Sequence, residues 1–195
     1  MKGWLWAALV VGLGCGRAVA PESVELQAGW VLEGVGSAEV PGHVLLELER
    51  AGRVPNAFHG TNEGAVQWVE DSAWTYRTKL VRPEGWSVHD PTFLLFEGLD
   101  TYATVEVDGA VVLEADNALR TWRSADFPAG AEHELVVRFD PVAARGLEVA
   151  GGQATLPASN EPRPIGAQSS PYTRKAPYQF GWDWGPRLAG PGIPG

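Results

Sequence analysis

Residues 103–114 read Ala-Thr-Val-Glu-Val-Asp-Gly-Ala-Val-Val-Leu-Glu, and they point most directly to a fold. Two short apolar runs flank the dipeptide Asp108-Gly109. A two-residue turn of type I′ needs a positive φ at both central residues, and Asp-Gly between two apolar runs meets this need. The stretch therefore predicts a β-hairpin with strands at 103–107 and 110–114.

Segments on both sides of this hairpin also have the character of short strands. Residues 74–81 are rich in strand-forming residues with a polar residue at every second position, and residues 132–139 form another such run. A continuous apolar run at 92–97 predicts a strand that is buried on both faces, while residues 24–35 alternate more loosely. Regular short strands separated by turns with Gly and Pro indicate an all-β chain, with a β-sandwich as its architecture.

Two segments depart from this pattern. Residues 44–51, followed by Gly52, predict one short helix, although their leucines would also fit a strand. Residues 141–171 contain many Gly and Pro residues with Ala, Ser and Asn between them, and they predict a long loop. A loop of this length in a compact domain is usually functional or mobile. It leads into the C-terminal segment 172–195.

The composition suits one globular domain with a core of its own. The chain has 195 residues, of which 45% are hydrophobic and 20% are charged. The formal net charge is −9, and the chain has no basic run. Because nucleic acids and anionic membranes bind clustered Lys and Arg, neither is an expected partner. Cys15 is the only cysteine, which excludes an intrachain disulfide.

Residues 1–20 have the pattern of a signal peptide. Lys2 gives a positive start, residues 4–14 form an apolar run too short to span a bilayer, and Ala-Val-Ala at 18–20 fits a cleavage site. This pattern predicts an exported protein, secreted or periplasmic, with no membrane span. A buried N-terminal strand or helix is the alternative. The surroundings of Cys15 also loosely fit a lipoprotein attachment site, so lipidation stays open.

Residues 178–187 read Tyr-Gln-Phe-Gly-Trp-Asp-Trp-Gly-Pro-Arg and concentrate aromatic side chains around one carboxylate. A Trp face can stack on the C–H face of a sugar, and the Asp183 carboxylate can accept strong hydrogen bonds from neighbouring hydroxyls. The segment therefore suggests a sugar site, although large aromatics also fill cores. In a regular strand Asp183 would point opposite to Trp182 and Trp184. The flanking glycines instead predict an irregular backbone at 181–186, with Trp182 more buried than Trp184.

Several stretches, in order from about residue 29 to residue 188, resemble the N-terminal domain of the β-mannosidases of glycoside hydrolase family 2. The most specific blocks are Arg-Lys-Ala at 174–176 and Gly-Trp-Asp-Trp-Gly-Pro-Arg at 181–187. The other matching stretches lie at 40–44, 48 with 51–55, 60–63, 67–70, 74–77, 96–103 and 117.

This resemblance implies a jelly-roll β-sandwich of the galactose-binding-like type. The sandwich would span residues 21–140, the long loop 141–171, and the substrate-site segment of the same domain 172–195. In complete members of the family, immunoglobulin-like domains and a (β/α)₈ barrel follow. The barrel carries the two catalytic glutamates of a retaining glycosidase, while the N-terminal domain helps to bind the terminal β-mannosyl residue.

The resemblance assigns sugar binding in this chain to Asp183, Trp184 and Trp182. Asn62 and Glu63 lie in a loop that is expected to approach the same site, although Asn62 would also serve simply to cap a turn. The expected ligands are β-mannosyl saccharides. The expected protein partner is a catalytic barrel domain, in cis or in trans.

No catalytic residue is expected within the chain. Retaining hydrolysis needs two carboxylates about 5 Å apart, whereas acidic pairs such as Glu47 and Glu49, or Glu70 and Asp71, are interpreted as solvated surface charge. The chain alone is therefore expected to be inactive. The alternatives are a stand-alone weak carbohydrate-binding module and a non-functional fragment.

The histidines give no sign of a metal site. They stand at positions 43, 59, 89 and 133 and lack the close spacing of zinc ligands. Neither a metal nor a cofactor is expected.

Overall fold

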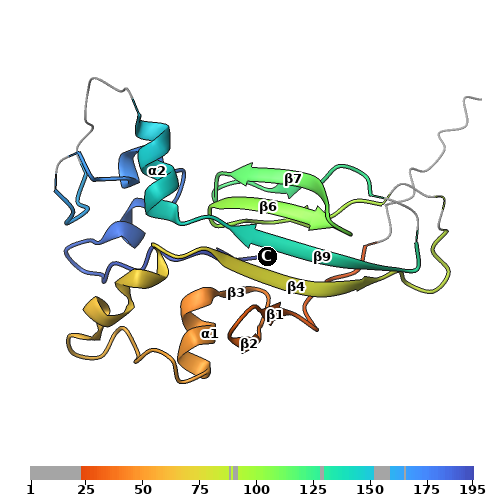
Figure 1. Cartoon of the computed structure of the whole chain (residues 1–195), viewed down its shortest axis with the longest axis horizontal. Helices are drawn as coiled ribbons and strands as arrows, with labels where there is room; N and C mark the ends of the chain where they lie inside the picture. The colour runs from red at the N-terminus through yellow and green to blue at the C-terminus, as the bar shows by residue number, and fades with distance from the viewer. Residues whose placement is uncertain (1–22, 88, 90–91, 128–129, 152–158, 165) are drawn as a thin grey trace, which may run out of the picture.

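The computed structural model of the chain describes residues 23–87, 89, 92–127, 130–151, 159–164 and 166–195. The predicted signal peptide, with Cys15, lies outside these residues. The main element is an antiparallel sheet of six strands in the order β2-β1-β4-β9-β6-β7 (Figure 1). Its strands are β1 (Val31–Leu32), β2 (Gly36–Ser37), β4 (Trp74–Val81), β6 (Tyr102–Val107), β7 (Ala110–Asp116) and β9 (Glu132–Phe139).

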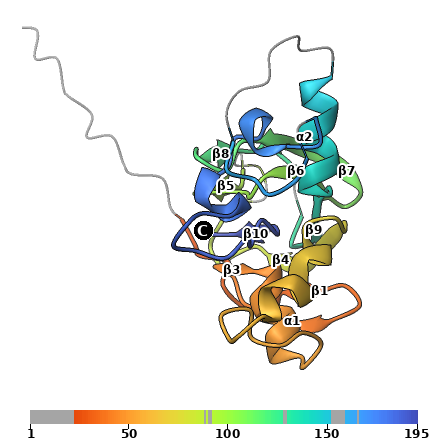
Figure 2. The same ribbon diagram turned by 90° about the vertical axis from the view of Figure 1, so that its left-hand side faces the viewer.

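Four short strands form a second layer. β3 (Gly42–His43) pairs with β10 (Gly192–Ile193), and β5 (Leu95–Phe96) pairs with β8 (Trp122–Arg123). Figure 2 shows β3, β5 and β10 on one side of β4, β6 and β9. Apolar side chains from both layers belong to one buried core. The prediction of an all-β sandwich is confirmed.

The hairpin predicted around Asp108-Gly109 is present as β6 and β7. Asp108 and Gly109 have φ angles of 51° and 79°, as a type I′ turn requires. The Asp108 carboxylate also accepts the backbone N–H of Glu134 at 2.8 Å and contacts Nδ1 of His133 at 2.7 Å. The turn therefore joins the hairpin to β9 as well as closing it.

The central strands largely alternate between buried and exposed side chains, which gives the sheet one apolar face and one charged face. On the apolar face, the Tyr76 ring meets Trp30 and Phe139 edge-on, with centroids 6.4 Å and 6.1 Å apart. On the other face, charged residues pair across strands, as Arg77 does with Glu134 at 3.1 Å. The alternation of apolar and polar residues along these strands thus indicates which face of the sheet packs against the core.

Two predicted strands are shorter than expected. In the run 92–97 only Leu95 and Phe96 form a strand, and Leu95 is 61% exposed, so the prediction of burial on both faces is wrong. In the run 24–35, the strand covers only residues 31 and 32. Apolar content indicated that these segments contribute to the core, but it could not show how few of their residues pair with a neighbouring strand.

The predicted helix at 44–51 is confirmed as α1 (Val44–Arg50). The loop predicted at 141–171 is wrong in its first part, because a nine-residue helix, α2 (Val142–Ala150), begins there. The described residues also form the 3₁₀ helices η1 (Asn62–Val69), η2 (Ser170–Tyr172) and η3 (Pro177–Phe180). Within the described residues, no helix is long and apolar enough to cross a membrane.

Gly146 explains why α2 was not predicted. As one of the glycines in 141–171 it favours a loop in the sequence pattern, yet it lies in the middle of the helix. A Cβ at this position would lie 2.5 Å from Thr173 Oγ1 and 2.8 Å from Ser169 Cβ. The glycine therefore allows α2 to pack closely against the segment around η2, and its role is close approach rather than chain reversal.

A buried ion pair joins the C-terminal segment to the sheet. Lys175 Nζ lies 2.5 Å from Asp100 Oδ2 and donates to the Gly190 carbonyl at 2.9 Å, and the Lys175 side chain is fully buried. Asp100 also exchanges two backbone hydrogen bonds with Gly192, 3.0 and 3.1 Å long. Burial lowers the pKa of Lys175, while the Asp100 carboxylate opposes that shift.

His43 reaches the same junction from β3. Its Nδ1 accepts the backbone N–H of Leu45 at 3.1 Å and so caps α1. Nε2 therefore carries the proton and donates to the Gly190 carbonyl at 2.8 Å. Burial lowers the pKa of His43 to about 4, and the nearby Lys175 charge adds to this effect. The neutral imidazole is the form that fits the folded protein.

We predict that protonation of His43 destabilises the fold at mildly acidic pH. Because folding lowers its pKa from 6.5 to about 4, the unfolded state binds the extra proton between these values, and stability falls as the pH drops through this window. The loss is roughly 2 kcal/mol at pH 5 relative to pH 7.5, and urea unfolding at the two pH values measures it. The variant His43→Asn, which can still cap α1, should lose clearly less. Equal losses would contradict the assignment.

The variant Gly146→Ala should be destabilised by roughly 1–3 kcal/mol, because its methyl group would clash with Thr173 and Ser169. Helix propensity acts in the opposite direction, since Ala favours a helix. The matched control is Ala144→Gly, at an exposed position of α2, which should cost only about 0.5–1 kcal/mol. Thermal unfolding compares the two variants. A Gly146→Ala protein at least as stable as the wild type would disprove the close packing.

Candidate functional site

The Trp-Asp-Trp segment forms a tight turn. Trp182 and Gly185 exchange both backbone hydrogen bonds, each 3.2 Å long, so Asp183 and Trp184 occupy the tip. Gly181 precedes the turn with a φ of 107°, a value that favours glycine. The prediction of an irregular backbone in this segment is confirmed. Figure 1 shows the C-terminal segment, in dark blue, starting at the end of the molecule that holds α2 and running back to the sheet.

Three aromatic rings gather at this turn. Trp184 is 72% exposed and Trp182 is 41% exposed, which confirms the predicted order of burial. The Trp184 ring lies between two neighbours, with its centroid 5.8 Å from Tyr178 and 6.4 Å from Trp182, at tilts of 38° and 49°. The neighbouring rings support Trp184 while most of its surface stays open to a ligand.

Asp183 lies at the tip beside Trp184 and is exposed. Within the part of the chain that the structure describes, its carboxylate has no hydrogen bond and no ion pair. An open aromatic face next to an unpaired carboxylate provides stacking and charge-assisted hydrogen bonding at one place. These are the two kinds of contact that a sugar ring offers through its C–H face and its hydroxyls.

The structure brings Glu63 to the base of this turn. Glu63 Oε1 accepts the backbone N–H of Arg187 at 2.7 Å, and Gln67 Nε2 donates to the Arg187 carbonyl at 2.9 Å. Burial lowers the pKa of Arg187, and the Glu63 charge opposes that shift. Asn62 instead donates to the Asn56 carbonyl at 3.0 Å. Both Asn62 and Glu63 lie in the first turn of η1, so the expectation that they lie in a loop is wrong. Contact of Asn62 or Glu63 with a sugar stays a prediction.

A buried network of charges lies beneath the turn. The Glu70 carboxylate pairs with Arg187, whose Nε donates to Oε2 at 3.2 Å, and it also accepts from Arg163 Nη2 at 2.6 Å. Arg163 in turn reaches Asp71 at 2.9 Å and Glu161 at 3.4 Å. The network thus connects the end of η1, the segment before η2, and the residue that follows the Trp-Asp-Trp-Gly-Pro block.

The interpretation of Glu70 and Glu47 as solvated surface charge is wrong. Glu70 is 2% exposed and Glu47 is 3% exposed, and each is paired with arginine. Sequence reasoning missed Glu70 because its partner Arg187 is 117 positions away. Glu70 and Arg187 each lie in a stretch that resembles the family, at 67–70 and 181–187. This shared feature was the signal that could have indicated a contact between them.

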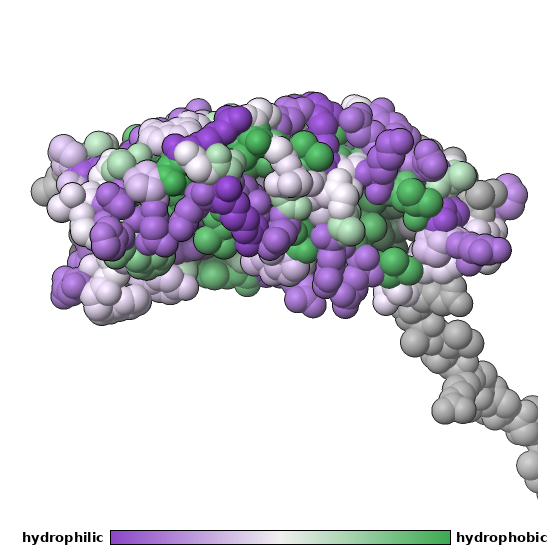
Figure 3. Space-filling model, turned by 90° about the horizontal axis from the view of Figure 1, so that it is seen from below, coloured by the Kyte–Doolittle hydropathy of each residue, from purple (hydrophilic) through white to green (hydrophobic). Residues whose placement is uncertain are grey.

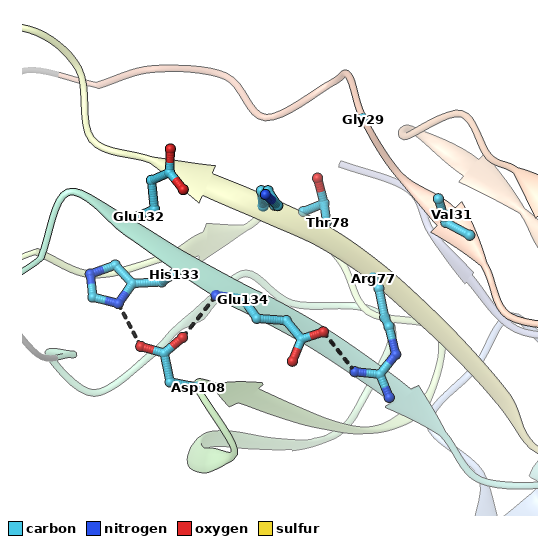
Figure 4. A pocket seen from close by; sticks show the side chains of 9 residues that line it. Gly29, Val31, Arg77, Thr78, Asp108, Glu132, His133 and Glu134 are labelled. Carbon is cyan, nitrogen blue, oxygen red and sulfur yellow. Dashed lines mark hydrogen bonds and ion pairs between the residues drawn. The ribbon is translucent and has the colours of Figure 1, made fainter.

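A separate hollow lies on the charged face of the sheet, near the turn between β6 and β7 (Figure 4). Its volume is about 410 Å³. Many of the charges that line it already pair with one another, as Arg77 does with Glu134 and Asp108 with His133. The described residues that line it include no Trp, Tyr or Phe. It is therefore a poorer candidate for sugar binding than the aromatic turn.

The rest of the surface that the structure describes holds no stronger candidate site. Among the described residues, no group of three or more His, Cys, Asp and Glu side chains is placed to hold a metal ion. Figure 3 shows one face of the molecule, on which hydrophilic and apolar residues are interspersed. The turn at 182–185 is the place where aromatic rings and a free carboxylate coincide.

Comparisons with known proteins identify relatives of the chain. Residues 23–195 match the family described as "Glycosyl hydrolase 2 galactose-binding domain-like". The β-mannosidase B of Thermothelomyces thermophilus is 38% identical over 156 residues, which cover 77% of this chain and 17% of that protein. The β-mannosidase B of Emericella nidulans is 36% identical over 160 residues, covering 79% of this chain and 18% of that protein.

A solved structure agrees with these matches. The β-D-mannosidase from Dictyoglomus thermophilum superposes with a TM-score of 0.78 and 34% sequence identity, over 88% of this chain and 22% of that one. The chain thus spans only 17% to 22% of the length of these relatives. Fold and sequence together show that the chain belongs to the galactose-binding-like N-terminal domains of glycoside hydrolase family 2.

Proposed function

We propose that these residues form the sugar-binding N-terminal domain of a β-mannosidase-like glycoside hydrolase, which helps to hold the terminal β-mannosyl residue of its substrate. The observation that carries this proposal is the turn at 182–185, where Trp184 is 72% exposed beside the unpaired carboxylate of Asp183. The three relatives named above are β-mannosidases, and their names indicate which sugar we propose.

The chemistry of the turn suits a neutral sugar. The Trp184 face can cover the C–H side of the ring, and the Asp183 carboxylate can accept hydrogen bonds from two neighbouring hydroxyls. Trp182, which is less exposed, completes the wall beside them. Glu63 supports the base of the turn, because its carboxylate accepts the backbone N–H of Arg187. Asn62 also remains a proposed sugar contact, although its side-chain amide donates to the Asn56 carbonyl.

Hydrolysis is assigned to other residues in this proposal. A retaining glycosidase needs an acid/base and a nucleophile about 5 Å apart, and the matched relatives have most of their length outside the segment that matches this chain. We propose that a barrel domain, in cis or in trans, supplies both catalytic carboxylates. The domain described here contributes one wall of a shared site.

The first prediction concerns sugar binding. Mannose should bind the 195-residue chain with a Kd of the order of millimolar or weaker, because one wall buries little of a monosaccharide. Asp183→Asn should weaken binding about tenfold through the loss of charge-assisted hydrogen bonds, and Trp184→Ala should abolish it. NMR titration that follows the indole N–H signals of Trp182 and Trp184 measures both effects.

Two matched controls accompany this titration. Glu132→Gln neutralises an exposed carboxylate at the other end of the sheet, and Phe58→Ala removes a ring that is 74% exposed. Both variants should bind mannose like the wild type. If mannose shifts neither Trp182 nor Trp184, or if the controls lose as much affinity as the Asp183 and Trp184 variants, the proposed sugar site is wrong.

The second prediction concerns catalysis. The 195-residue chain should hydrolyse an aryl β-mannoside no faster than its Asp183→Ala variant, because the proposal places the pair of catalytic carboxylates in the barrel domain. Release of the aryl group, recorded at high protein concentration, gives both rates. A rate for the wild type that clearly exceeds the rate of the variant would show that the chain carries a catalytic site of its own.

A further inference from the structure

Glu70 is the point where three segments beneath the aromatic turn meet. It follows η1, it pairs with the Arg187 side chain, and it accepts from Arg163 at 2.6 Å. Its backbone also takes part, because the Glu70 carbonyl accepts the N–H of Val142 at the start of α2, at 3.1 Å. One buried residue thus contacts η1, α2, the Arg163 segment and the base of the turn.

Arg187 transmits this contact to the tip. Only Pro186 separates it from Gly185, the residue that closes the turn with Trp182. Its backbone is fixed on both sides, with the N–H held by Glu63 at 2.7 Å and the carbonyl held by Gln67 at 2.9 Å. Its guanidinium is held by Glu70. The four-residue turn therefore stands on an arginine whose main chain and side chain are both anchored.

We propose that Glu70 is a positioning residue for the sugar site: by holding Arg187 against Arg163 it sets the orientation of Asp183 and Trp184 and thereby the affinity for sugar. This inference rests on the proposed function. Glu70 does not touch the ligand; it acts through Arg187.

Among the charged residues of the network, Glu70 has the largest effect on the position of Arg187, and the reason is electrostatic. Its buried carboxylate balances two guanidinium groups, and removing one partner of a buried pair leaves the other charge without compensation. Without the negative charge, the Arg187 and Arg163 guanidinium groups would repel each other, and the Arg187 side chain would shift and strain the main chain that Glu63 and Gln67 hold. The turn is attached to Arg187 through Pro186, so it would move as well.

A second buried carboxylate in the chain provides a matched control. Glu47 in α1 is 3% exposed, pairs with Arg50 at 2.8 Å and accepts the backbone N–H of Glu39 at 3.1 Å. It is as buried as Glu70 and also bound to arginine, but none of its contacts involves the turn or its base. Loss of charge at Glu47 should therefore lower stability without affecting the sugar site.

The experiment compares Glu70→Gln with Glu47→Gln in the 195-residue chain labelled with 5-fluorotryptophan. Fluorine NMR without sugar reports the surroundings of Trp182 and Trp184, which are assigned through Trp→Phe variants, and titration with mannose reports affinity. Both variants should unfold at a lower temperature. Only Glu70→Gln should shift the two fluorine signals, and only it should weaken mannose binding, by at least fivefold.

The outcomes separate this inference from the proposed function. If both variants leave the fluorine signals and the affinity unchanged, or if both alter them equally, Glu70 is merely structural and the inference fails. If the wild type does not bind mannose, the proposed function fails, and the sugar-free fluorine signals alone decide whether Glu70 positions the turn. If Glu70→Gln does not fold, Arg163→Gln takes its place, because the Arg163 side chain is 21% exposed and its loss should shift the same signals.

Discussion

The C-terminal part of this domain depends on one buried ion pair. Lys175 and Asp100 meet where the chain returns to the sheet, and the Gly190 carbonyl accepts hydrogen bonds from both Lys175 and His43. Buried pairs of this kind add little net stability, but a chain position that leaves either charge unpaired is strongly disfavoured. The pair therefore selects one docking of the segment that follows it, and that segment carries the aromatic turn.

In the proposed site, the exposed tip of the turn would contact the sugar, and the buried base would hold the tip in place. Asp183 and Trp184 at the tip are exposed and free of polar partners within the described residues, whereas Glu70 and Arg187 at the base are buried and fully engaged. A rigid base allows the tip to keep open, ligand-ready groups without losing its shape. This is the arrangement expected where a site must be preformed.

Features fixed by local chemistry could be predicted from the sequence. The Asp108-Gly109 hairpin, the helix α1 and the irregular backbone around Trp182 each follow from residues that are neighbours in the chain. Features that depend on contacts between residues far apart in the chain could not be predicted from the sequence. The local sequence around Gly146 favours a loop, and only its contact with the segment around η2 explains a glycine within a helix. The local sequence around Glu70 favours surface charge, and only its bond to Arg187, 117 positions away, explains its burial. The site's exposed half was thus accessible to sequence reasoning, and its buried half was not.

The distance along the chain between the two halves of the site has a consequence for the proposed sugar recognition. Arg187 donates hydrogen bonds to Glu63 and Glu70 and accepts one from Gln67, and these bonds join residues that are 117 to 124 positions apart. Closing a loop of this length costs entropy, which the ordered chain between the two ends must help to repay. The base of the turn therefore depends on the whole intervening chain, whereas the tip is closed by hydrogen bonds between residues close in sequence. Under the proposed function, sugar recognition is thus a property of the complete fold and not of the aromatic segment by itself.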